Sequence, residues 1–313
     1  MNAIKQEWRP QPDVTDHTGN RLPENRVFFV PPPLEIGHIL SAYSSVVCGK
    51  MPNPIGRRLA IGAVLAAIAI GIVRLNVRDF NLSFVEGMEA MLIFGGLAGL
   101  LGFLISNRAN FCSYVGEQGV ARYKLKKDPE QTRQGKVFLF QNAAELRTAQ
   151  IRNNFHGAYT STSYDFSWSD AKGKQVFLLS GRYRSEKGTP KAGDAFYFVR
   201  ASEAAWSTFV FERAKAELAR IGTIRFNLLG SNHLLIGPGF LEICDNGQTT
   251  RCHQHEIARI ALSRGVVTLR RTDAWSGVFG IGSIGIFSFD YSYLGNAQLF
   301  RTLLKDMVGV EFS

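Results

Sequence analysis

Two long apolar runs with a short polar loop between them limit what this chain of 313 residues can fold into. The first run, RRLAIGAVLAAIAIGIVR, covers residues 57–74, and the second, AMLIFGGLAGLLGFLI, covers residues 90–105. Neither run has the polar stripe that a surface helix of a soluble domain carries. Apolar residues of the loop extend both runs toward the roughly 20 residues of a bilayer span. We therefore predict a transmembrane helical hairpin over residues 57–107; a buried hairpin inside a soluble core is the alternative.

Small residues recur four positions apart within both runs, a spacing that lets two helix backbones approach closely in lipid. The pairs are Gly62/Ala66, Ala67/Gly71 and Gly95/Gly99. They predict helix–helix contacts, either inside the hairpin or with helices of another subunit.

Basic residues flank the hairpin on both outer sides. Lys50, Arg57 and Arg58 precede the first run, and a basic group follows the second. By the positive-inside rule both termini should lie in the cytoplasm, as expected of a protein that spans the membrane twice. The first 56 residues have no apolar stretch of the signal-peptide type, so we expect no cleaved leader.

The net charge of +10 suits either nucleic acid or the anionic cytoplasmic leaflet. Because the basic group lies just beyond a predicted span, we favour the bilayer, where each such charge contributes about 1 kcal/mol. We expect no nucleic-acid partner. The candidates for contact with lipid headgroups are Arg122, Lys124, Lys126, Lys127 and Arg133; the alternative is a solvated basic loop.

Residues 1–56 form a proline-rich tail that contains FFVPPPLE, a stretch typical of extended polyproline structure. Such a segment builds no core of its own, so we expect it to be disordered or laid against a protein partner. Between Leu34 and Val47, apolar residues recur at helical spacing and predict a short amphipathic helix that leads to the membrane surface.

The sequence offers little catalytic chemistry. Cys244, Cys252, His253 and His255 lie close together, but the cysteines are eight positions apart, which does not fit the zinc templates. The Asn-Gly pair between them predicts a two-residue hairpin turn that places Thr249 opposite Cys244. We expect no metal, no cofactor and no enzymatic activity, because no nucleophile, base and orienting group are recognisable together.

Beyond the hairpin the pattern changes to strands. Residues 162–168 (TSYDFSW) alternate apolar and polar side chains, and residues 176–184 and 195–200 predict two further strands. We expect Ser202 to cap a helix that runs to about Ile221. Its apolar face consists of Trp206, Val210, Ala214, Leu218 and Ile221.

A second block of short strands follows and ends in another helix, whose predicted buried face includes Phe300 and Leu304. Two successive blocks of antiparallel strands, each closed by one amphipathic helix, indicate a duplication of element order. The two copies have no obvious residue identity.

The segment HQHEIARIALSRGVVTLRR followed by SFDYSYLGNAQLFRTLLKDM resembles the second half of bacterial pleckstrin-homology-like (PH-like) domains. The matching positions are Glu256–Ile257, Gly265, Asn296, Phe300 and Leu303. The part from YVGEQGVARY to the turn at residues 169–175 resembles the first domain of uncharacterised bacterial membrane proteins with tandem PH-like domains. The resemblance spans residues 111–309 and implies small curved barrels, each capped by a helix, with a binding or scaffolding role. It also implies that the membrane is a bacterial inner membrane.

Together these features predict a membrane-anchored α+β protein with a tail (1–56), a transmembrane hairpin (57–107) and two PH-like domains (110–222 and 223–313). The expected function is that of a non-enzymatic adaptor or scaffold that binds a protein segment or lipid. The alternative is an integral accessory subunit of a larger membrane complex, with the hairpin and the tail packed on partner subunits.

Overall fold

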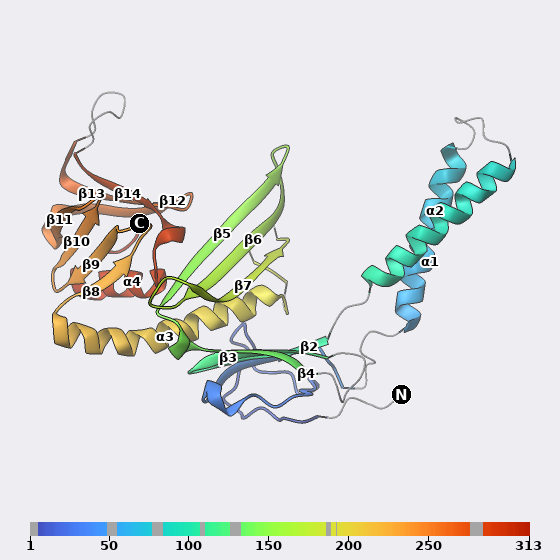
Figure 1. Cartoon of the computed structure of the whole chain (residues 1–313), viewed down its shortest axis with the longest axis horizontal. Coiled ribbons are helices and arrows are strands. Elements are labelled where there is room, and N and C mark those ends of the chain that lie inside the picture. Colours follow the sequence, from blue (N-terminus) through green and yellow to red (C-terminus); the bar gives the residue numbers. More distant parts are fainter. Residues whose placement is uncertain are drawn as a thin grey trace.

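A computed structural model of the chain describes residues 6–48, 55–76, 84–106, 110–125, 133–185, 189–191, 193–275 and 284–313. The described chain has α+β architecture, with two apolar helices that stand apart from four antiparallel sheets (Figure 1). This coarse fold class confirms the prediction. In the described part of the chain the sheets do not close into a barrel, so the barrels expected from the PH-like resemblance are not seen.

The described elements fall into two units with the same order. The first unit contains a four-stranded sheet of β1 (Ile39–Ser44), β2 (Asn110–Gly116), β3 (Gly119–Leu125) and β4 (Arg133–Leu139). A three-stranded sheet of β5 (Glu145–Phe155), β6 (Ala158–Ser169) and β7 (Gln175–Tyr183) follows, and the unit ends in helix α3 (Ala195–Ile221).

The second unit repeats this plan. Its four-stranded sheet contains β8 (Ile224–Asn227), β9 (His233–Gly237), β10 (Phe240–Asp245) and β11 (Gln248–His253). Its three-stranded sheet contains β12 (Ile257–Ser263), β13 (Val266–Trp275) and β14 (Ile284–Asp290), and helix α4 (Ala297–Leu303) runs into a π-helical turn (Leu304–Val308). The repeated order is in line with the duplication expected from the sequence.

The apolar hairpin, formed by α1 (Ile55–Asn76) and α2 (Phe84–Ile105), lies between two neighbouring strands of one sheet. Strand β1 ends before α1, β2 begins after α2, and the two strands pair antiparallel from Ile39 opposite Gly116 to Ser44 opposite Cys112. Thus the first sheet takes one strand from each side of the hairpin. The hairpin occupies the place of the turn that would connect β1 to β2.

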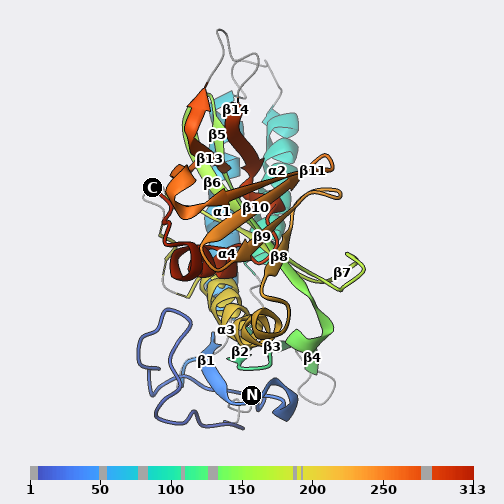
Figure 2. The same ribbon diagram turned by 90° about the vertical axis from the view of Figure 1, so that its left-hand side faces the viewer.

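The described part of the tail is ordered against its own chain. It covers one face of the first sheet, where Phe28, Phe29 and Val30 pack with Cys112 and Tyr114 (Figure 2). The Tyr114 hydroxyl donates to the carbonyl of Val30. The tail therefore forms a second layer of the first unit, and the expectation that it builds no core of its own is wrong for these residues.

The amphipathic helix predicted between Leu34 and Val47 is also wrong. A single 3₁₀ turn (Leu34–Ile36) ends at Gly37, whose φ of 77° no helix continues, and β1 follows. The apolar spacing suited a helix, but pairing with β2 satisfies the backbone of residues 39–44 in a ladder. A partner strand almost seventy positions away decides the local structure here.

Helix α3 begins earlier than the sequence predicted. Residues 195–200, expected as a strand, form its first turns, because the Asp194 side chain accepts a hydrogen bond from the Phe196 amide (2.9 Å) and caps the helix. Ser202, expected as the cap, lies buried inside the helix and donates to the carbonyl of Phe198. The predicted apolar face is buried at Trp206, Val210 and Ala214, is partly buried at Leu218 and is exposed at Ile221.

Two local predictions in the second unit are confirmed. Asn246 and Gly247 form the turn between β10 and β11, with Cys244 opposite Thr249 and Asp245 opposite Gln248. The closing helix buries Phe300 and Leu304. One continuous hydrophobic core runs from Val115 of the first unit to Val308 of the second, so the two units share their interior.

Candidate functional site

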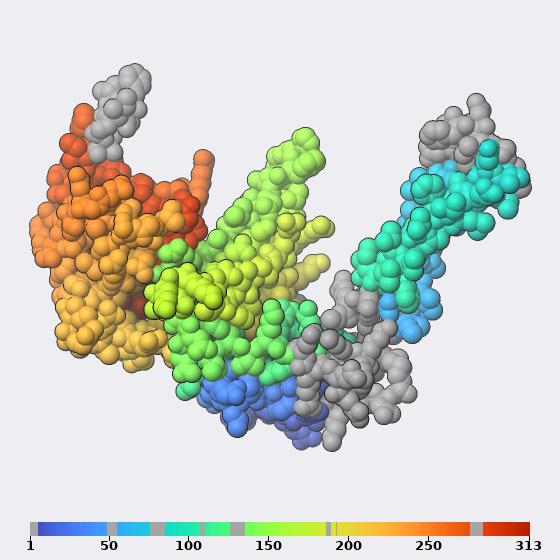
Figure 3. All heavy atoms as spheres, in the orientation of Figure 1, coloured from blue at the N-terminus to red at the C-terminus, as the bar shows by residue number. Residues whose placement is uncertain are grey.

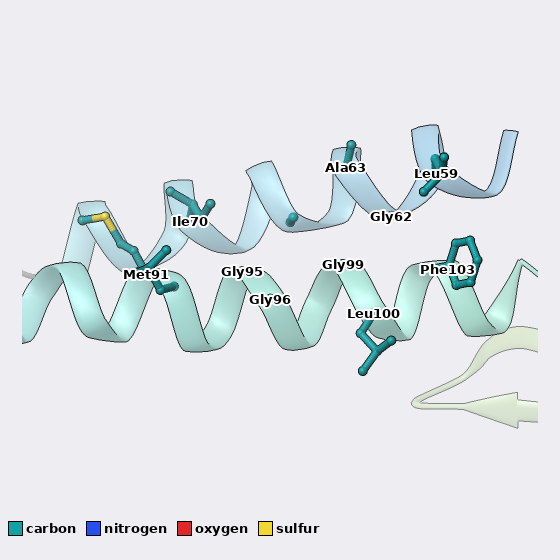
Figure 4. Close-up of a pocket in the computed structure, with 12 residues that line it drawn as sticks. Leu59, Gly62, Ala63, Ile70, Met91, Gly95, Gly96, Gly99, Leu100 and Phe103 are labelled. Carbon is teal, nitrogen blue, oxygen red and sulfur yellow. The ribbon is translucent and has the colours of Figure 1, made fainter. Parts of the chain in front are cut away.

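The two helices of the apolar hairpin approach each other at glycines (Figure 4). A Cβ atom at Gly62 would lie 2.8 Å from the carbonyl oxygen of Gly99, and one at Gly102 would lie 2.7 Å from the Leu65 side chain. A Cβ atom at Gly95 would meet Ile70 at 2.7 Å. These small residues thus make a contact inside the chain, one of the two alternatives that the sequence left open.

The outer surface of the apolar hairpin is uncovered in the described chain. Each helix contains a 21-residue stretch that is long and apolar enough to cross a bilayer, and only 11% of the apolar window is buried (Figure 3). A core helix of a soluble protein would be mostly buried. An exposed apolar surface of this extent is typical of a site that contacts lipid or another protein. The residues concerned include Leu59, Val64, Ile68, Ile72, Leu92, Ile93, Phe94, Leu97, Leu100, Leu101 and Leu104.

Arg58 connects the open ends of the two helices. Its guanidinium donates from Nε (3.3 Å) and Nη2 (3.1 Å) to the carbonyl oxygen of Phe103, and it stacks over the Phe103 ring at 3.9 Å. That carbonyl belongs to the last turn of α2, where backbone acceptors lack helical partners and a cation is favoured. Arg58 is buried, whereas its neighbour Arg57 is exposed. The helix that enters the hairpin therefore holds the end of the helix that leaves it.

The five predicted headgroup ligands do not form one described cluster. Lys126 and Lys127 lie outside the described residues, and of Arg133 only the backbone is described, opposite Leu125 in the β3–β4 ladder. Lys124 is exposed on β3, next to the end of β2 that follows the hairpin. Contact of these residues with lipid stays a prediction.

The Arg122 side chain packs inside the fold. Its guanidinium stacks over the Phe111 ring at 4.6 Å, and its Nε atom is buried with no hydrogen-bond acceptor among the described residues. Burial lowers the pKa of Arg122 from its ordinary value. A side chain that is held against an aromatic ring inside the fold is less available to lipid than the exposed Lys124.

A cavity of about 200 Å³ lies where the tail, the first sheet and the start of α3 meet. His17 lines it, and the two ring nitrogens of His17 are each 2.8 Å from a serine hydroxyl, Nδ1 from Ser41 on β1 and Nε2 from Ser113 on β2. Burial lowers the pKa of His17 to about 3, against a smaller raising effect of Asp16. A neutral His17 therefore ties the tail to both strands that flank the hairpin.

The contact between His17 and Ser113 does not make an accessible nucleophile. The Ser113 side chain is only 1% exposed, and Nδ1 of His17 faces a serine rather than a carboxylate. The pair therefore lacks the carboxylate that orients the histidine of a catalytic triad. Among the described residues no three His, Cys, Asp or Glu side chains are grouped to hold a metal ion.

Asn296 joins the two units. Its side-chain oxygen accepts hydrogen bonds from the Leu146 amide (3.0 Å) on β5 and from Trp206 Nε1 (2.9 Å) on α3, while its own backbone adopts the left-handed region with φ of 52°. Nearby, Glu145 accepts from Asn227 Nδ2 at 2.9 Å. An open, polar cleft of about 630 Å³ lies beside this junction, between the end of the β5–β7 sheet and β8.

The sequence did not identify His17 or Asn296 as functional residues. Asn296 was noted only as a position in the PH-like resemblance, and nothing around His17 marked it, because its partners are 24 and 96 positions away. His17 lies among other polar residues, such as Asp16 and Thr18, so its neighbours in the sequence gave no signal.

Comparison with known proteins adds no identity. No family model matches the chain, and no curated protein matches it.

Proposed function

We propose that this protein is a membrane-anchored, non-enzymatic adaptor or scaffold of a bacterial inner membrane. The apolar hairpin would span the bilayer twice, and the two units would lie in the cytoplasm and bind a protein segment or lipid. The observation that carries the proposal is that the uncovered apolar hairpin connects β1 to β2, two strands that pair with each other. Both ends of the hairpin continue into strands of one sheet, which suits an anchor that leaves and returns on the same side of a bilayer.

The PH-like assignment of the two units belongs to the same proposal. It is supported by the repeated order of a four-stranded sheet, a three-stranded sheet and a closing helix. The open cleft beside Asn296 supplies a polar surface for a bound segment. Binding, rather than catalysis, is the role that this arrangement supports.

Cysteine labelling in membrane vesicles tests the anchor and its orientation. In a chain whose Cys48 and Cys244 are replaced by Ser, a thiol is introduced either at Asn81, in the loop between the apolar runs, or at Asn246, in the exposed β10–β11 turn. We expect an impermeant maleimide to reach position 81 only from the non-cytoplasmic side and position 246 only from the cytoplasmic side. Labelling of both positions from one side, or release of the chain by a carbonate wash, refutes the proposal.

The alternative function, an integral accessory subunit of a larger membrane complex, is favoured by a groove of about 540 Å³ along the apolar hairpin. Gly96 lines this groove, and a Cβ atom at Gly96 would meet nothing within 4 Å. The hairpin itself therefore does not need a glycine there. A helix from another subunit would fit against such a small residue.

Two leucine substitutions separate the adaptor from the subunit. Gly96→Leu fills the groove, whereas Gly71→Leu adds the same side chain at an equally open position outside it. If the protein is an accessory subunit, Gly96→Leu should remove co-purifying membrane proteins from mild detergent extracts and Gly71→Leu should retain them. Equal co-purification from both variants speaks against a helix bound in this groove.

A further inference from the structure

The β5–β6 hairpin projects a bare apolar tip. Its strands are the longest in the described chain, 11 and 12 residues, and they meet at a tight turn of His156 (φ 47°) and Gly157 (φ 81°). Phe155, next to the turn, is 68% exposed, and Ile151, four residues earlier on β5 opposite Ser163, is 58% exposed. Both lie away from the core that the same strands cover farther down, and the one ring contact of Phe155 in the described chain is with the neighbouring turn residue His156, edge to face at 4.2 Å.

The surroundings of this tip are basic. Arg152, Arg182 and Arg184 are exposed on the same end of the sheet, and the Arg152 guanidinium lies over the Tyr159 ring at 5.0 Å. Residues 146–164 contain no Asp or Glu at all. Exposed apolar side chains flanked by arginines are complementary to an anionic bilayer. The apolar side chains can insert among the lipids while the guanidinium groups bind lipid phosphates.

The direction of the β5–β6 tip also agrees with contact to the bilayer. Figures 1 and 2 both show it extending away from the first sheet on the same side as the apolar hairpin. The paired ends of β13 and β14 point to the same side, and they expose Trp275 (58%) and Ile284 (65%). Aromatic side chains of this kind concentrate at the interface between water and lipid. The bilayer that receives the apolar hairpin is thus the surface that the tip faces.

We propose that the β5–β6 tip inserts Phe155 and Ile151 into the headgroup region of the anionic leaflet that the apolar hairpin enters, with Arg152, Arg182 and Arg184 on lipid phosphates. This inference rests on the proposed membrane anchor and adds a second attachment, which fixes how the first unit is oriented over the bilayer. Each arginine contributes about a fivefold factor to the occupancy of the inserted state.

A fluorescent label beside the tip tests the insertion in the full-length chain. The environment-sensitive dye NBD is attached to Asn154→Cys, or to the control Lys172→Cys in the exposed β6–β7 turn, with Cys48 and Cys244 replaced by Ser. The protein is reconstituted in nanodiscs of phosphatidylcholine and phosphatidylglycerol. We expect blue-shifted emission and quenching by doxyl-labelled lipid at position 154, and quenching by aqueous iodide at position 172.

Substitutions then connect the signal to the proposed contacts. Phe155→Ser with Ile151→Ser should abolish lipid quenching at position 154, whereas Leu178→Ser, an exposed apolar residue elsewhere on the same sheet, should retain it. Replacing the three arginines with Gln, or using discs of phosphatidylcholine alone, should reduce it.

The outcomes are distinguishable. A chain that co-elutes with the discs but whose label at position 154 is fully open to iodide overturns the insertion, retains the anchor and leaves a protein partner as the occupant of the tip. A chain that does not co-elute with the discs overturns the anchor, and this proposal with it.

Discussion

Ser44 and Cys112 are strand partners 68 positions apart, and the Cys112 thiol lies 3.5 Å from the Ser44 hydroxyl. The whole apolar hairpin is enclosed between them. Since residues that face each other in one ladder lie on one side of any bilayer, the apolar hairpin must leave and return on the same side. The ladder therefore requires an even number of crossings between Ser44 and Cys112.

We predict that Ser44→Cys forms a disulfide with Cys112 under copper–phenanthroline oxidation, because facing side chains at this separation meet the geometric requirement. With a protease site placed within residues 77–83, the two fragments should stay joined on a non-reducing gel and separate after reduction. Ser45→Cys is the control, since its side chain turns to the Phe111 amide instead. Separation of the Ser44→Cys fragments without reductant contradicts the ladder.

Arg58→Gln should destabilise the apolar hairpin by about 1–3 kcal/mol, because it removes a charged donor from the carbonyl of Phe103. Arg57→Gln changes the same charge at an exposed neighbour and should have little effect. Resistance to unfolding by sodium dodecyl sulfate in mixed micelles measures the difference. Equal resistance of the two variants would show that the hydrogen bonds from Arg58 to the Phe103 carbonyl do not stabilise the apolar hairpin.

Stability should fall as the pH is lowered from about 6.5 toward 3. Burial lowers the pKa of His17 to about 3 in the folded chain, so in this window the unfolded chain binds a proton that the folded chain does not. The loss amounts to at most about 1.4 kcal/mol per pH unit. His17→Gln should flatten the dependence of urea unfolding on pH, with His255→Gln at an exposed site as the control for the loss of one histidine. An unchanged slope in His17→Gln would contradict this assignment.

Asn296→Ala should cost about 2–5 kcal/mol, since it leaves the Leu146 amide and Trp206 Nε1 without their acceptor and places alanine in a left-handed conformation. Asn296→Asp keeps an acceptor and should restore much of the loss. Gln298→Ala, on the exposed side of α4, should be near neutral. Thermal unfolding monitored by far-ultraviolet circular dichroism provides the measurement. A neutral Asn296→Ala would show that Asn296 does not stabilise the junction.

Features that depend on neighbouring residues were predictable from the sequence. The Asn246–Gly247 turn, the period-two strand at 162–168 and the closing helix with Phe300 each follow from a few adjacent positions. The apolar hairpin belongs to the same class, because length and composition alone identify it.

Features that depend on distant contacts were missed. Strand β1 looks helical in isolation and becomes a strand only because β2 pairs with it. The start of α3 looks like a strand, yet the Asp194 cap and burial against the core make it helical. The hydrogen bonds of His17 and Asn296 connect positions up to 96 and 152 residues apart, a separation at which one sequence shows no pairing.

The order of synthesis gives the enclosed hairpin another consequence. Strand β1 leaves the ribosome before either apolar helix, whereas its partner β2 is made only after both. Until then, an unpaired strand edge and the aromatic tail residues that later cover Cys112 and Tyr114 stay open in the nascent chain. Chaperones and proteases recognise such edges. A chain that ends before β2 cannot close its first sheet and keeps this edge exposed.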